Sequence, residues 1–159
     1  MAPRIAVLGT TEVEDAVDGG SLTRRDRVVL GALATSHGET LTVDQLSDAL
    51  WGDEPPKSSA KVVQGSVMRL RRMLGSDAIE TDGSGYRLAL NGDTVDAQAF
   101  ERLVARAREL AAAHGPERAA TTYQQALALW RGTPLPELQD WDPGRAEAER
   151  LLEVRRSVE

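Results

Sequence analysis

The chain carries, at residues 58–74, the sequence SSAKVVQGSVMRLRRML, in which apolar and basic side chains alternate at helical spacing. Ser58 or Ser59 can cap the start of a helix, and Gly75 can end it. At about 100° per residue, one face collects Val63, Val67, Leu70 and Leu74. The opposite face collects Lys61, Gly65, Met68, Arg69 and Arg72, flanked by Val62, Gln64 and Arg71. The segment therefore predicts a helix that is apolar inside and basic outside.

The preceding segments predict two shorter helices. Thr23 and Asp26 have the spacing of a capping box, and apolar residues then repeat at helical spacing until Gly38. Thr42 and Gln45 have the same spacing and predict the start of a second helix. Gly52 and the prolines at residues 55–56 predict its end.

Strand patterns lie on both sides of these helices. Residues 4–8 predict a strand within a small N-terminal hairpin region. Residues 79–81 and 86–90 predict two strands joined by a glycine turn at residues 82–85. The predicted elements follow the order of a winged helix-turn-helix domain: a short helix, a turn marked by prolines, a basic helix and a hairpin. In such a domain the second helix of the pair enters the major groove of DNA.

After Gly92 the composition becomes alanine-rich and helical. Helices are predicted at about residues 97–113 and 116–130, then a proline-containing loop, then a final helix from near Pro143 to the end of the chain. We therefore expect an α+β winged helix-turn-helix domain at residues 1–92, followed by an all-α, tetratricopeptide-like helical domain at residues 93–159.

The charge distribution favours one segment as a nucleic-acid contact. The net charge of −6 argues against a nucleic-acid ligand at first. Residues 57–74, however, hold five Lys and Arg side chains and no acid. Without further context such a basic face is more often a solvated surface.

Composition excludes several kinds of chemistry. The absence of cysteine excludes disulfides, thiolate metal sites and cysteine nucleophiles. His37 and His114 lie at predicted helix ends beside glycines and are interpreted as C-terminal capping residues. No nucleophile, base and orienting group form a recognisable constellation, so we expect no enzyme, no metal and no cofactor. With no signal peptide and no apolar run of about 20 residues, we expect a cytoplasmic protein with no membrane partner.

Several motifs resemble one known family. The sequences TVDQLSDALWGDEPP (42–56), VMRLRRML (67–74) and GSGYRL (83–88) resemble the OmpR-type winged helix of the antibiotic regulatory protein (SARP) family of transcriptional activators. VDAQAFE (95–101) and ALALWRG (126–132) resemble the bacterial transcriptional activator domain that follows it there. The resemblance implies an activator that binds direct repeats beside a promoter, as a dimer on the DNA, and recruits RNA polymerase through its sigma and other subunits. It also implies control of a biosynthetic gene cluster for a secondary metabolite.

The helix geometry and this resemblance together indicate which residues contact double-stranded DNA. By position, Arg69 resembles a base- or backbone-contacting arginine of the family, and Arg71 and Arg72 resemble phosphate-side positions. Lys57 and Lys61 suit phosphate as point charges. The full candidate set is Lys57, Lys61, Gln64, Gly65, Met68, Arg69, Arg71, Arg72 and Arg87.

Two features depart from the family pattern. Family wings commonly carry an arginine just before the Gly-x-Gly-Tyr turn, where this chain has Asp82. The family's activator domain is usually longer than residues 93–159, so we expect part of that domain and a last helix without its packing partner. A different class of function, a protein-interaction adaptor that uses the helical domain with weak or no DNA binding, stays open because the net charge is acidic.

Overall fold

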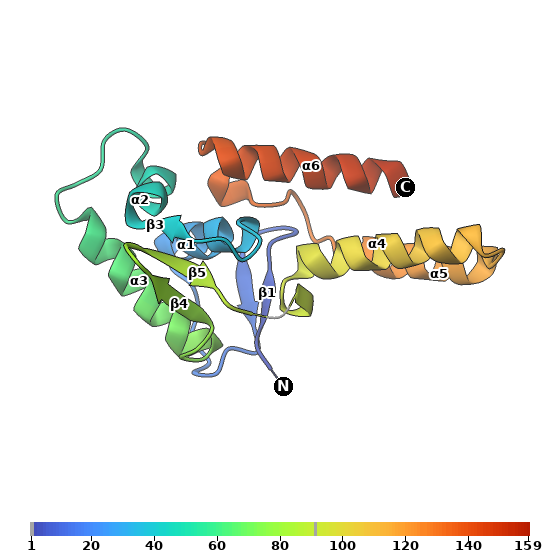
Figure 1. Cartoon of the computed structure of the whole chain (residues 1–159), viewed down its shortest axis with the longest axis horizontal. Helices are drawn as coiled ribbons and strands as arrows, with labels where there is room; N and C mark the ends of the chain where they lie inside the picture. Colours follow the sequence, from blue (N-terminus) through green and yellow to red (C-terminus); the bar gives the residue numbers. More distant parts are fainter. Residues whose placement is uncertain (1, 91) are drawn as a thin grey trace.

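The computed structural model describes residues 2–90 and 92–159, whose elements Figure 1 shows in chain order. The winged part contains β1 (Arg4–Ala6), β2 (Glu12–Glu14), α1 (Arg24–Thr35), β3 (Leu41–Thr42), α2 (Val43–Trp51), α3 (Ser59–Leu74), β4 (Ile79–Asp82) and β5 (Gly85–Leu88). The helical part contains the 3₁₀ helices η1 (Gly92–Thr94) and η2 (Pro136–Leu138), and the α-helices α4 (Asp96–Ala112), α5 (Pro116–Leu127) and α6 (Asp142–Val158). The predicted order, α+β first and all-α afterwards, is confirmed.

The first two helices begin at the capping boxes that the sequence predicts. The Thr23 hydroxyl accepts from the backbone N–H of Asp26 at 3.2 Å, and the Asp26 carboxylate accepts from the N–H of Thr23 at 3.3 Å. Thr42 and Gln45 make the same reciprocal pair at the start of α2, at 3.1 and 2.8 Å. Each box pairs two backbone donors that a helix start otherwise leaves without a partner.

The wing is a three-stranded antiparallel sheet in the order β3-β5-β4. Two residues connect β4 to β5, and Gly83 adopts a φ of 57°, which suits a tight hairpin turn. Leu41 of β3 pairs with Tyr86 of β5. At Gly85 a Cβ atom would lie 2.2 Å from the Leu41 carbonyl oxygen, so glycine is what allows β3 to approach.

The helical part consists of a hairpin and a separate long helix. In Figure 1, α4 and α5 lie side by side and extend away from the winged part, while α6 runs above α1 and the near part of α4. Phe100, Val104 and Ala107 are buried as the helical pattern predicts, whereas Ala111, also expected inside, is exposed near the free end of the hairpin. No helix in the described residues is long and apolar enough to span a bilayer.

The expectation that the last helix lacks a packing partner is wrong. Ala148 and Leu151 of α6 are buried, and α6 contacts α1, α4 and η2. The contact with α1 gives this helix a partner in the winged part, which local sequence cannot reveal.

One apolar core runs through both parts of the chain. Val7 and Leu8 after β1 belong to the same buried cluster as Phe100 of α4 and Leu135 before η2. Ile5 also forms a parallel bridge with Val95, across the expected boundary at residue 92. That boundary stays a prediction, and the two parts pack together as one body.

Candidate nucleic-acid interface

The outer face of α3 and the loop before it present three of the predicted basic residues to solvent. Lys57, Lys61 and Arg72 are exposed, and none of them forms an ion pair or side-chain hydrogen bond with another described residue. On the opposite side, Val63, Val67 and Leu70 are at most 1% exposed. The predicted phase of this helix is therefore confirmed.

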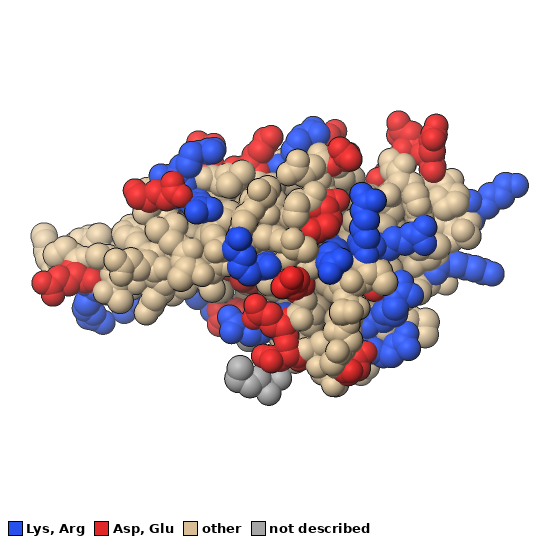
Figure 2. Space-filling view, turned by 180° about the vertical axis from the view of Figure 1, so that it is seen from behind, with Lys and Arg blue, Asp and Glu red and all other residues tan. Residues whose placement is uncertain are grey.

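Positive charge is concentrated at this side of the molecule. Figure 2 views the protein from behind, so α3 lies toward the right, where Lys and Arg side chains gather near the edge. Elsewhere on this face, acidic and basic side chains are mixed. Although the whole chain is acidic, a local positive surface of this kind can attract a polyanion.

Arg69, predicted as a base or backbone contact, lies against Asp26 of α1. Its Nε and Nη2 donate to Asp26 Oδ1 at 3.1 and 2.9 Å, and Nη2 also donates to the Ser66 hydroxyl at 3.2 Å. Only the Nη1 edge takes no part in these bonds. The arginine therefore holds α3 against α1, and DNA contact by Arg69 stays a prediction restricted to that one edge.

Asp26 is the partner that sequence reasoning missed. Its side chain is 1% exposed. Burial raises its pKa, but hydrogen bonds from Arg69, Ser66 and the Thr23 backbone outweigh burial and leave the pKa of Asp26 below the ordinary value of 3.8. The capping box signalled a carboxylate at this position, although nothing local indicated that it also binds an arginine of α3.

Arg71, predicted at a phosphate-side position, connects α3 to the wing. Its Nε donates to the Ile79 carbonyl at 2.9 Å, and its Nη2 donates to the Thr81 hydroxyl at 3.0 Å. The guanidinium carbon lies 5.8 Å from the centre of the Tyr86 ring, at cation–π distance. Arg71 thus sets the position of the hairpin relative to α3.

The hairpin carries two further charged residues of interest. Arg87 pairs with Glu80 on the neighbouring strand, where the two residues are in register. Asp82 lies exposed at the end of the hairpin and accepts a hydrogen bond from the Thr40 hydroxyl at 2.6 Å. The carboxylate therefore stands at the hairpin end, with its oxygen turned toward the loop before β3.

We expect Asp82→Arg to tighten binding to cognate and scrambled duplexes alike, by about 1 kcal/mol, because it exchanges repulsion from phosphates for attraction. Titrations of both duplexes at two salt concentrations measure this effect. Glu149→Arg on α6 is a matched control, since it makes the same change of charge away from the wing. Unchanged affinity for both duplexes would show that the hairpin end does not approach DNA.

The helical part is hydrogen-bonded to the N-terminal strand through Asp96. Its Oδ1 accepts from the N–H of Val7 at 2.8 Å, and its Oδ2 accepts from the N–H of Leu8 at 3.2 Å. Burial raises the pKa of Asp96, although these bonds and the nearby Arg131 lower it in part. The backbone N–H of Arg131 adds a bond to the Leu8 carbonyl at 2.8 Å. Residues before and after the expected domain boundary thus share a buried polar junction.

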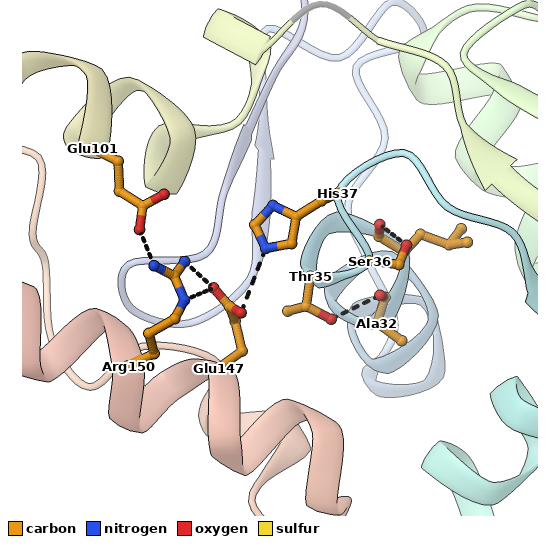
Figure 3. Close-up of polar contacts among 8 residues, drawn as sticks. Ala32, Thr35, Ser36, His37, Glu101, Glu147 and Arg150 are labelled. Carbon is orange, nitrogen blue, oxygen red and sulfur yellow. Dashed lines mark hydrogen bonds and ion pairs between the residues drawn. The ribbon is translucent and has the colours of Figure 1, made fainter. Parts of the chain in front are cut away.

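A second junction joins α1, α4 and α6, as Figure 3 shows. His37, in a left-handed conformation just after α1, places Nε2 3.5 Å from Glu147 of α6. Arg150 of α6 pairs with both Glu147 and Glu101 of α4. The contacts of Arg150 join α4 to α6 within the helical part, and the contact between His37 and Glu147 links α6 to the end of α1.

Comparison with known proteins finds a family match for each part of the chain. Residues 18–88 match the family described as transcriptional regulatory protein, C terminal, and residues 95–158 match the bacterial transcriptional activator domain. The fold and these matches define a transcriptional regulator, not an enzyme, with a winged helix followed by a helical activator domain.

Individual relatives agree with this class. The regulatory protein DnrI of Streptomyces peucetius is 31% identical over 148 residues, which cover 86% of this chain and 54% of DnrI. The transcriptional regulator RedD of Streptomyces coelicolor is 32% identical, over 96% of this chain and 45% of RedD. The structure of Mycobacterium tuberculosis EmbR, solved with a low affinity phosphopeptide, matches with a TM-score of 0.84 and 27% identity, over 98% of this chain and 43% of EmbR.

This chain belongs to the SARP family of transcriptional regulators. It spans about half the length, or less, of these relatives.

Proposed function

We propose that this chain is a sequence-specific DNA-binding activator whose α3 enters the major groove of direct repeats beside a promoter. Two copies bind the repeats, and the helical part recruits RNA polymerase, including its sigma subunit. The regulated genes form a biosynthetic cluster, and the protein acts at the chromosome in the cytoplasm. The observation that carries the proposal is the acid-free surface formed by α3 and the loop before it, on which Lys57 of the loop and Lys61 and Arg72 of α3 have no ionic partner among the described residues.

The spacing of these cations suits a groove. Lys61 and Arg72 are separated by about 16 Å along α3, at a rise of about 1.5 Å per residue. The major groove is about 12 Å wide, so cations near the two ends of the helix can reach phosphates on opposite strands. Gln64, Gly65 and Met68 lie between them and are the residues that we assign to base edges.

The other candidate contacts have supporting roles in this proposal. Arg71 is bonded to the wing, and Arg87 is paired with Glu80. In the proposal, the rest of each guanidinium faces the phosphate backbone of the DNA. Arg69 contributes mainly by holding α3 in place. The acidic wing end at Asp82 contributes little affinity, so specificity depends on α3 and on the paired copies.

Lys61→Gln and Arg72→Gln are each expected to weaken binding to all duplexes and to reduce the slope of log affinity against log salt by about 1, because each removes one phosphate contact. The duplex is first obtained by selection from random oligonucleotides and then titrated at several salt concentrations. Arg118→Gln on α5 is a charge-matched control that should leave the slope unchanged. Salt-independent binding, or binding to no duplex, would overturn the activator proposal and favour the adaptor.

A further inference from the structure

The middle of the exposed face of α3 is apolar, although both ends are basic. Met68 is 60% exposed, and the other large hydrophobic side chain exposed to this degree in residues 2–90 and 92–159 is Val17, in the loop after β2. At about 100° per residue, Lys61, Met68 and Arg72 fall on one stripe of the helix, because seven and four residues separate them. An exposed thioether thus lies between two cations without ionic partners.

The surroundings of Met68 restrict Arg69, the other candidate base-reading side chain on this part of α3. Arg69 follows it directly, but Asp26 binds the Nε and Nη2 donors that would otherwise make a bidentate contact with guanine. Gly65, one turn before Met68, has no side chain, and a Cβ atom there would meet only Arg69 Nη1, at 3.5 Å. A base edge can therefore approach Met68 across Gly65, where Arg69 Nη1 is the side-chain atom that lies nearby.

The chemistry of the groove identifies what such a residue contacts. Among the base edges of the major groove, the only apolar group is the 5-methyl group of thymine. Methionine is flexible and polarizable, so it adapts to a methyl group without demanding one geometry. Gln64, one turn earlier and also exposed, carries an amide that matches the N6 and N7 positions of adenine.

We propose that Met68 contacts the 5-methyl group of a thymine at the centre of each half-site, so that α3 selects an A·T pair there. This inference rests on the proposed function, because it requires α3 to occupy the major groove. It adds a chemical identity to the base pair that the middle of the helix reads.

The test uses the selected duplex with each thymine of a half-site replaced, one at a time, by deoxyuridine, which removes only the methyl group. For the wild-type protein, one position per half-site should lose affinity about three- to tenfold, as expected for burial of one methyl group. Met68→Ala should bind the thymine and deoxyuridine duplexes equally at that position. Val17→Ala, which truncates the other exposed hydrophobic side chain, should keep the full preference.

The possible results separate this inference from the proposed function. If the wild-type protein binds no duplex, the proposed function fails, and this inference fails with it. If it binds with the expected salt dependence but no deoxyuridine lowers affinity, or the selected half-site contains no thymine, this inference alone is overturned. It is also overturned if Met68→Ala, with an unchanged melting temperature, keeps the thymine preference.

Discussion

Arg69→Ala is expected to lower the free energy of unfolding by about 2 to 4 kcal/mol at neutral pH, because it leaves the buried carboxylate of Asp26 without its cation. Asp26 is 1% exposed, whereas the Arg69 side chain is 43% exposed, so the loss arises mainly from the unpaired acid. Urea unfolding at neutral pH measures the change. Arg72→Ala removes an exposed arginine three residues away and should change stability by no more than about 0.5 kcal/mol.

The pH dependence of this loss follows from the direction of the pKa shift. In the wild-type protein the pKa of Asp26 is below its ordinary value of 3.8, so the ion pair stabilises the fold above that value. That stability is lost as the pH falls through the lowered folded-state pKa, where Asp26 becomes protonated. The difference between wild type and Arg69→Ala should therefore be largest at neutral pH and shrink toward pH values below 3.8. An equal difference at all pH values would contradict the role given to Asp26.

Asp96→Ala is expected to lower the free energy of unfolding by about 2 to 3 kcal/mol, because the backbone N–H groups of Val7 and Leu8 lose their acceptors inside the protein. The gain from no longer burying a carboxylate, whose pKa is raised, offsets part of the loss. Asp96→Asn keeps one oxygen acceptor, so it should lose about half as much stability.

Denaturant unfolding together with amide hydrogen exchange tests this junction. The amides of Val7 and Leu8 should lose protection in Asp96→Ala beyond what the global change in stability explains. Asp140→Ala, a substitution of an exposed aspartate, should leave both quantities unchanged. Full protection of both amides in Asp96→Ala would mean that Asp96 does not hold the N-terminal strand.

The elements of the winged part follow from interactions between residues close in sequence. Two pairs of residues, each three positions apart, set the starts of α1 and α2: Thr23 with Asp26, and Thr42 with Gln45. The spacing of Val63, Val67 and Leu70 determines which face of α3 is buried. A glycine with positive φ determines the hairpin turn. Each of these features depends on backbone geometry within about one turn, so the sequence alone was sufficient to predict it.

The candidate site was predictable only as a set of exposed positions. Helical periodicity indicated that Lys61, Gln64, Met68 and Arg72 face outward, and they do. It could not distinguish the two arginines that have partners, Arg69 and Arg71, from the cations that have none. Periodicity indicates the direction in which a side chain leaves its own helix. A partner on another element depends on the tertiary fold, which brings segments distant in sequence together.

The sequence by itself determined the helices, the wing and the outward face of α3, because local hydrogen bonds and apolar spacing specify them. Only the tertiary structure decided that Arg69 binds Asp26, 43 residues away, and that Asp96 binds Val7, 89 residues away. It also decided that α6 packs on α1. These pairings depend on which surfaces meet when distant segments bury a shared core. Inside that core an unpaired charge or backbone donor costs free energy, so such groups are paired.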